Sequence, residues 1–190
     1  MSLGPVALLA SGTSRTESPM RERSKETAKL RRHFTATGYV AREDAVLLHW
    51  HRKLAMWLPP GGHVEANEDP VQAALREARE ETGLEVELIE QRPGFAFQTP
   101  RQVQPPAVIL IEDIDDPIDG PHQHIDSIYF LCLGAPDVDA PDGWLWVTQA
   151  DLKANVPIVA PSGIPVTAAE DVRELGLAAI QACREAQSAN

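Results

Sequence analysis

One segment, residues 61–84, constrains the structure of this 190-residue chain more than any other. It opens with two glycines directly after two prolines and continues with the pattern of a single helix. Asp69 fits the N-cap of that helix, Pro70 fits its first position, and Gly83 fits the left-handed residue that ends a helix. The sequence therefore predicts a helix from about Pro70 to Thr82, entered from a tight turn.

Three carboxylates share one face of this predicted helix. Glu77, Glu80 and Glu81 are spaced so that their side chains project from the same side. They repel one another by about a few tenths of a kcal/mol per pair, and the helix macrodipole disfavours anions near its C-terminus. The residues that would hold the helix on a core form an apolar stripe: Val71, Ala74, Leu75 and Ala78. A solvated surface tolerates such a cluster, whereas a site for hard divalent cations would use it, because Mg²⁺ and Mn²⁺ prefer carboxylate oxygen.

The wider pattern of the segment favours the second interpretation. It fits G-x5-E-x7-R-E-U-x-E-E-x-G-U, where U is an aliphatic residue. The matching residues are Gly62, Glu68, Arg76, Glu77, Glu80, Glu81, Gly83 and Leu84. This pattern is the Nudix box, and the chain resembles the Nudix hydrolase superfamily over residues 33–155. Ala78 stands at the first aliphatic position, where a larger side chain is usual.

The resemblance implies a fold, an activity and a set of site residues. Nudix hydrolases are α/β proteins, built as α/β/α sandwiches with a mixed central sheet, and they hydrolyse a nucleoside diphosphate linked to another moiety. Glu77, Glu80 and Glu81 fall on the metal-binding glutamates of the family, and the carbonyl of Gly61 falls on its backbone ligand. Mg²⁺ is the expected ion, with Mn²⁺ as an alternative. Arg76 falls on the arginine that orients a box carboxylate, and Glu80 or Glu81 is the expected general base.

The chemistry of the expected substrate agrees with this assignment. A small, nucleotide-like diphosphate is anionic, so a carboxylate cluster alone would repel it. Divalent ions bridge the two and stabilise the charge that develops during displacement at phosphorus. The alternative is a sensor of the same fold that binds nucleotides without hydrolysing them.

A second group of polar residues comes near a strong predicted strand at residues 125–133. Alternate residues of a strand share a face, so His122, His124 and Asp126 are predicted to lie together. One interpretation is substrate contact, and another is a separate transition-metal site, which imidazole and carboxylate suit. The third is a solvated strand end in which Asp126 satisfies a neighbour. Trp57 is a further candidate, either stacked on a nucleobase or packed in the core.

The remaining pattern predicts a mixture of strands and helices around one core. Further strands are predicted at residues 34–40, 45–50, 53–58, 84–89, 108–111 and 144–147. Capping-box spacing at Thr148–Asp151 and Thr167–Glu170 predicts a short helix and a final helix that ends near Gln187. Two long, proline-rich loops are predicted at residues 91–106 and 113–121, and the second is acidic enough to suggest a distant base, although a solvated loop is favoured.

Charge is unevenly distributed along the chain. The net charge is −11, and residues 1–32 alone carry seven basic and three acidic side chains. We predict a basic, flexible arm or start-site extension over residues 1–32 and one Nudix domain with a C-terminal helix over residues 33–190. An arm that contacts phosphate or a partner is the alternative. The acidic excess argues against a long nucleic acid as partner, and no apolar run reaches the ~20 residues of a membrane helix.

The chain has two cysteines, Cys132 and Cys183. Two cysteines are too few to stabilise a fold of this size as its main cross-links, so we expect buried thiols in a reducing, cytoplasmic compartment. The final helix and the basic arm are the two segments that could form a homodimer.

Overall fold

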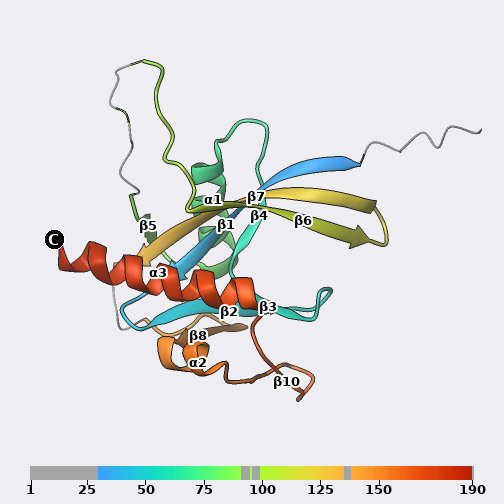
Figure 1. The fold of residues 1–190 in the computed structure, drawn as a ribbon, viewed down its shortest axis with the longest axis vertical. Coiled ribbons are helices and arrows are strands. Elements are labelled where there is room, and N and C mark those ends of the chain that lie inside the picture. The colour runs from blue at the N-terminus through green and yellow to red at the C-terminus, as the bar shows by residue number, and fades with distance from the viewer. Residues whose placement is uncertain (1–29, 91–94, 96–98, 135–137, 190) are drawn as a thin grey trace, which may run out of the picture.

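A computed structural model describes residues 30–90, 95, 99–134 and 138–189 (Figure 1). The strands are β1 (Arg31–Ala41), β2 (Ala45–His51), β3 (Met56–Leu58), β4 (Gly61–His63), β5 (Val86–Leu88), β6 (Val108–Asp116), β7 (Gly120–Leu133), β8 (Trp144–Thr148), β9 (Ile158–Val159) and β10 (Pro165–Val166). The helices are α1 (Pro70–Thr82), α2 (Gln149–Ala154) and α3 (Glu170–Ser188). Within the described ranges, no helix is long and apolar enough to cross a membrane.

The central sheet is mixed, as predicted. β1 runs parallel to β7 along its whole length, from Arg31 opposite His122 to Ala41 opposite Cys132. The other pairings are antiparallel: β1 also pairs with β2 and β4, β7 with β5 and β6, and β2 with β3 and β8. β1, β6 and β7 extend together as a ribbon beyond the rest of the sheet (Figure 1).

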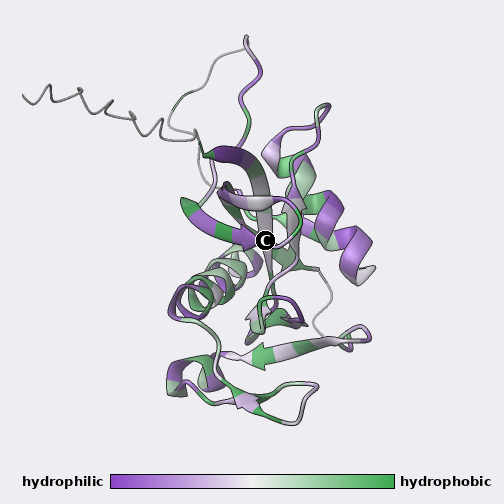
Figure 2. Cartoon of the chain, turned by 90° about the vertical axis from the view of Figure 1, so that its right-hand side faces the viewer, coloured by the Kyte–Doolittle hydropathy of each residue, from purple (hydrophilic) through white to green (hydrophobic). Residues whose placement is uncertain are grey.

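Two helices cover opposite faces of this sheet (Figure 2). Side chains alternate along a strand, so neighbouring residues of β1 and β7 enter different cores. Tyr39 and Ile128 pack in the core that contains Ile180 of α3. Val40 and Leu131 pack in the core with the alanines of α1. The layers therefore form the α/β/α sandwich that the sequence predicts.

Helix α1 begins and ends where its sequence signals lie. The side chain of Asp69 accepts a hydrogen bond from the Gln72 N–H at 3.0 Å, and the Gln72 side chain accepts one from the Asp69 N–H at 2.9 Å. Gly83 has φ +70°, and its N–H donates to the Arg79 carbonyl at 2.8 Å. The buried face of α1 differs slightly from the predicted stripe. The buried residues are Ala73, Ala74, Ala78 and Thr82. Small side chains at these positions allow α1 to lie close to the sheet.

The predicted acidic loop at residues 113–121 is wrong. This segment forms the outer half of a β6–β7 hairpin, in which Asp113 pairs with Gln123 and Asp115 pairs with Pro121. β6 is an edge strand whose side chains alternate between exposed and partly buried positions, so aspartates on its exposed side stay in water. The strand was missed because the consecutive acidic residues at its end show no clear alternation of apolar and polar side chains in the sequence.

Other element boundaries also depend on tertiary contacts. β4 and the β9–β10 hairpin were not predicted, because strands of two or three residues carry little pattern of their own. Thr148 caps α2 as predicted, by accepting a hydrogen bond from the Asp151 N–H. The capping box expected at Thr167 is wrong, since α3 has Ala169 at its N-cap and no side-chain cap bond. Most of the predicted arm and part of the 91–106 loop lie outside the described residues, and β1 already begins at Arg31.

The prediction of two free thiols is wrong. Cys132 of β7 and Cys183 of α3 are both buried, as expected, but they form a disulfide with their Cα atoms 5.3 Å apart. They are 51 residues apart in the sequence, and only the packing of α3 on β7 brings them together. The bond ties the C-terminal helix to the central sheet. It also removes free thiols as an argument for a reducing compartment.

Candidate metal and substrate site

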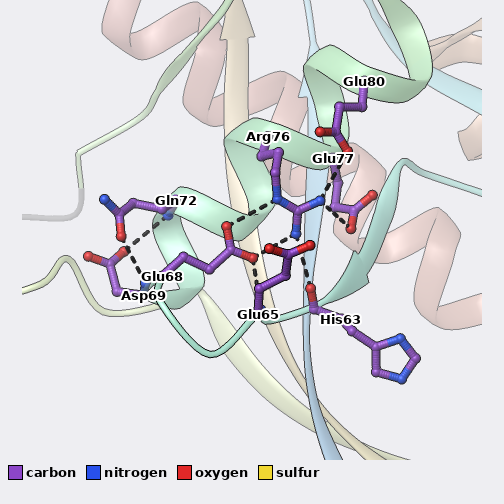
Figure 3. A network of polar contacts seen from close by, with 8 residues as sticks. All are labelled: His63, Glu65, Glu68, Asp69, Gln72, Arg76, Glu77 and Glu80. Carbon is purple, nitrogen blue, oxygen red and sulfur yellow. Dashed lines mark hydrogen bonds and ion pairs between the residues drawn. The ribbon is translucent and has the colours of Figure 1, made fainter.

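Arg76 is the centre of a network of carboxylates on α1 and on the loop before it (Figure 3). Its Nε and Nη2 donate to the two carboxylate oxygens of Glu68 at 3.1 and 2.6 Å, as a bidentate pair. Its Nη1 donates to Glu77 at 2.8 Å and to Glu80 at 3.1 Å. Nη2 also donates to the backbone carbonyl of His63 at 3.1 Å. One guanidinium therefore connects α1, β4 and the loop between them.

The two glycines before the helix are required by close packing. A Cβ atom on Gly62 would lie 2.6 Å from the carboxyl carbon of Glu77. A Cβ atom on Gly61 would lie 2.6 Å from the hydroxyl oxygen of Thr37 in β1. Contacts this short do not occur, so any larger residue would displace β4 or the carboxylate beside it. The pair of glycines allows β4 to pass between α1 and β1.

Glu81 completes the carboxylate face. One of its carboxylate oxygens accepts a hydrogen bond from the Gly61 N–H at 3.2 Å. The four residues predicted to bind metal, Gly61 and the three glutamates, are thus brought together where α1 meets β4. The side chain of Glu80 is 61% exposed, whereas that of Glu77 is 16% exposed. Glu80 is therefore the more accessible of these two carboxylates to an incoming molecule.

The pKa values of the network follow from these contacts. The hydrogen bonds from Arg76 lower the pKa of Glu68. The pKa of Arg76 is raised, first by Glu68 and then by Glu77, which keeps the guanidinium charged. Desolvation raises the pKa of Glu81; the Gly61 N–H opposes this shift, and the charges of the neighbouring glutamates add to it.

The second predicted group lies on one face of β7. The imidazole rings of His122 and His124 have their centroids 5.1 Å apart. Asp126 is only 4% exposed, and Thr35 and Thr37 of β1 donate to its two carboxylate oxygens at 3.0 and 2.7 Å. Burial raises the pKa of Asp126, and the two threonines oppose that shift. The contacts of Asp126 agree with the interpretation in which it satisfies its neighbours.

Three residues near this face were not singled out from the sequence. His33 of β1 lies opposite His124, His63 follows the box glycines, and Glu112 of β6 also lies opposite His124. Burial, followed by Asp126, raises the pKa of Glu112 to about 7. Burial and the surrounding imidazoles lower the pKa of His124 to about 4. The alternation of polar residues at His33, Thr35 and Thr37 was the available signal that β1 shares this face.

Trp57 lies in the core, away from the carboxylates. It is 2% exposed, and its ring centroid is 5.3 Å from that of Trp50 on the adjacent strand. This burial supports the interpretation of Trp57 as a core residue.

Comparison with protein families matches this arrangement to one of them. The sequence model of the NUDIX domain matches residues 31–161, which run from the start of β1 to just beyond β9. The chain belongs to the NUDIX family. The carboxylate network is thus the Nudix box of a NUDIX domain, with Gly62 at its first position and Leu84 at its last.

Relatives of this NUDIX protein include known hydrolases. A Nudix-family hydrolase from Clostridium perfringens superposes with a TM-score of 0.58 and 28% identity, covering 80% of this chain and 98% of that one. An asymmetrical bis(5'-nucleosyl)-tetraphosphatase of Mus musculus is 37% identical over 65 residues, which cover 34% of this chain and 44% of the relative. An m7GpppN-mRNA hydrolase of Xenopus laevis is 56% identical over 34 residues, 18% of this chain and 12% of the relative. The match therefore spans less than half the length of these two curated relatives.

Proposed function

We propose that this NUDIX protein is a divalent-metal-dependent hydrolase that cleaves the pyrophosphate linkage of a small nucleoside diphosphate derivative. One observation carries the proposal: Glu77, Glu80 and Glu81 converge beside Gly61 on a helix whose arginine holds two of them in place. The names of the mouse and frog relatives describe nucleotide substrates, which supports this substrate class.

The donor set fits Mg²⁺, or Mn²⁺ in its place. The four predicted metal ligands, the Gly61 carbonyl and the carboxylates of Glu77, Glu80 and Glu81, all offer oxygen, the type that hard divalent cations prefer. The guanidinium of Arg76 donates to three carboxylates, those of Glu68, Glu77 and Glu80, and the carboxylate of Glu81 lies beside Gly61. This excess of negative charge suits added cations. When bound, such ions would neutralise phosphate oxygens and favour attack by water.

The side chains of the protein have separable tasks in this reaction. Glu68 orients Arg76 through its bidentate pair, and Arg76 in turn orients Glu77 and Glu80. Glu80 or Glu81 accepts a proton from the attacking water as the new bond to phosphorus forms and the bridging P–O bond breaks. The sheet face that carries His122, His124 and Asp126 lies beside β4, and we place the rest of the substrate there.

The test is a product-resolved screen with Mg²⁺ over nucleoside triphosphates, ADP-ribose, dinucleoside polyphosphates and nucleotide sugars. We expect metal-dependent release of phosphate-containing products, and a loss of at least about 100-fold in kcat in Glu80→Gln or Glu81→Gln, because removing a group that acts in proton transfer costs about 10²–10⁴-fold. The matched control is Glu85→Gln, which changes an exposed carboxylate that pairs with the exposed Arg79.

Each result of this screen has a distinct meaning. Unchanged turnover in both Glu80→Gln and Glu81→Gln would contradict the assigned mechanism. Tight nucleotide binding without turnover, with Mg²⁺ and with Mn²⁺, would contradict the hydrolase and support a nucleotide sensor instead.

A further inference from the structure

Four of the six histidines of the chain lie close together beside the paired strands β1 and β7. They are His33 of β1, His63 of β4, and His122 and His124 of β7. The ring centroid of His33 is 5.3, 4.9 and 6.1 Å from those of His63, His122 and His124. Three strands that are far apart in the sequence supply these rings, so their meeting is a property of the fold.

The hydrogen bonds of these rings leave the same nitrogen available in two of them. His122 Nδ1 donates to the backbone carbonyl of Gly120 at 2.8 Å, which leaves Nε2 with a free lone pair. His33 Nδ1 pairs with His63 Nε2 at 3.2 Å, which again engages the δ nitrogen of His33. Metal-binding histidines are held in this way, with the second ring nitrogen bonded to a carbonyl or another group.

The third ring has an unsatisfied nitrogen. His124 Nε2 is buried and has no hydrogen-bond partner among the described residues. Its other nitrogen, Nδ1, lies 4.0 Å from a carboxylate oxygen of Glu112. A buried polar atom without a partner is costly, so its presence in a crowded polar cluster points to a missing ligand.

The separation of the three rings suits one metal ion. One ring nitrogen each of His33, His122 and His124 lie within 4.8 Å of one another. Zn–N bonds of about 2.0–2.1 Å place neighbouring nitrogens of a tetrahedral site about 3.3 Å apart. Side-chain rotations that shorten these separations by about 1.5 Å would therefore close the site, without any change in strand register.

We propose that His33, His122 and His124 bind a borderline transition-metal ion, Zn²⁺ in the first instance, at a site separate from the Nudix box. Imidazole nitrogen suits Zn²⁺, Ni²⁺ and Cu²⁺, whereas the carboxylates of the box suit Mg²⁺. His63 bonds to Nδ1 of His33, and the Gly120 carbonyl accepts from Nδ1 of His122. A carboxylate oxygen of Glu112 lies near Nδ1 of His124. Three protein ligands leave a fourth position open for water or an anionic ligand.

The experiment is a calorimetric titration of the full chain with Zn²⁺ in the presence of excess Mg²⁺, repeated in a Glu80→Gln background. Carboxylates are also Zn²⁺ ligands in proteins, so excess Mg²⁺ and this substitution are needed to separate the histidine site from the Nudix box. We expect one Zn²⁺ per chain in both proteins. Loss of an outer partner of a metal ligand weakens binding about 10–100-fold, so loss of a ligand in His33→Gln, His122→Gln or His124→Gln should weaken it at least about 100-fold. Co²⁺ in place of Zn²⁺ gives a visible spectrum as an independent measure of coordination.

The matched control is the double variant His49→Gln/His51→Gln. These two histidines also alternate along a strand, β2, and their ring centroids are 6.0 Å apart. The control should keep full Zn²⁺ affinity. Thermal unfolding without metal identifies any variant that does not fold, and His124→Gln breaks none of the short ring hydrogen bonds described above.

Three outcomes would overturn the proposal. The first is that no Zn²⁺ binds in the presence of excess Mg²⁺ or in the Glu80→Gln protein. The second is that Zn²⁺ affinity is unchanged in all three ligand variants. The third is that the same histidines bind inorganic phosphate in the absence of metal. None of these measurements depends on turnover, so failure of the hydrolase proposal and failure of this one are distinguishable.

Discussion

The carboxylate network around Arg76 and the histidine cluster around His33 are both dense polar groups, but they differ in whether the protein itself supplies hydrogen-bond partners to their polar atoms. In the first, protein donors already engage the carboxylates: Arg76 bonds to Glu68, Glu77 and Glu80. In the second, the rings mainly face one another, and His124 Nε2 has no partner within the described part of the chain. The two groups also differ in origin, because one comes from a single loop and helix and the other from three strands.

The carboxylate network is thus already paired with a cation of the protein, whereas the histidine cluster has a nitrogen without a partner among the described residues. A network with its own cation is ordered before any metal arrives, so metal binding there competes with an internal ion pair. A group of imidazoles without an internal partner gains its missing interactions only when a ligand binds. His63 belongs to both regions, because its carbonyl accepts from Arg76 (Figure 3). Its ring contacts His33.

The largest expected effect tests whether the carboxylate network depends on close packing. In Gly62→Ala the new Cβ would lie 2.6 Å from the Glu77 carboxyl carbon, so the carboxylate must move. A displacement of about 1 Å at a reacting site costs about 100-fold, and we expect that loss in kcat/KM. Gly134→Ala is the control, because its Cβ would meet no atom of the described residues within 4 Å. Equal activity of Gly62→Ala and wild type would show that Glu77 is not held where the reaction needs it.

The next prediction concerns the internal cation. Arg76→Ala removes the guanidinium that donates to Glu68, Glu77 and Glu80. We expect the free energy of unfolding without Mg²⁺ to fall by about 2 kcal/mol, below the 3–5 kcal/mol of a fully buried pair. Added Mg²⁺ should recover part of this loss. Arg79→Ala in the same helix removes an exposed pair with Glu85 and should change stability by less than about 1 kcal/mol. Equal losses in the two variants, measured by urea unfolding, would remove the distinction between network and surface pair.

A smaller effect is expected at the boundary between the two regions. Thr35 is buried and donates to Asp126, which in turn accepts from Thr37 next to Gly61. Thr35→Val removes a hydrogen bond to a buried carboxyl group, and such a bond is worth about 1.5–3 kcal/mol when the carboxyl group is charged. We expect a loss near the lower limit, measured by urea unfolding at neutral pH. An unchanged midpoint would indicate that Asp126 is not held by these threonines.

The same contrast explains what the sequence alone could predict. The box, its helix caps at Asp69 and Gly83, and the convergence of its glutamates follow from local spacing along one segment. The face shared by His122 and His124 follows from strand alternation. The position of His33 beside that face depends on the parallel pairing of β1 with β7. The disulfide between Cys132 and Cys183 depends on the packing of α3 on the sheet. No local pattern records which strands become adjacent, so these contacts required the structure.

The smallest stability change is also the sharpest test of the comparison. His124→Leu removes a buried Nε2 that has no hydrogen-bond partner among the described residues, and its Nδ1 is only a distant neighbour of Glu112, at 4.0 Å. No short hydrogen bond is therefore lost in exchange for the added apolar group. We therefore expect metal-free stability within about 0.5 kcal/mol of wild type, or slightly above it.

His122→Leu makes the opposite change, because it leaves the Gly120 carbonyl without its donor. That variant should lose about 1 kcal/mol without metal, the usual net value of a hydrogen bond. Both variants should lose the added stability that Zn²⁺ gives the wild-type protein, since each lacks one proposed ligand. Unfolding curves with and without Zn²⁺ measure all of these quantities together. If His124→Leu lowers the free energy of unfolding without metal as much as His122→Leu does, then Nε2 of His124 has a hydrogen-bond partner in solution. The histidine cluster would then have its polar atoms satisfied, as the carboxylate network does.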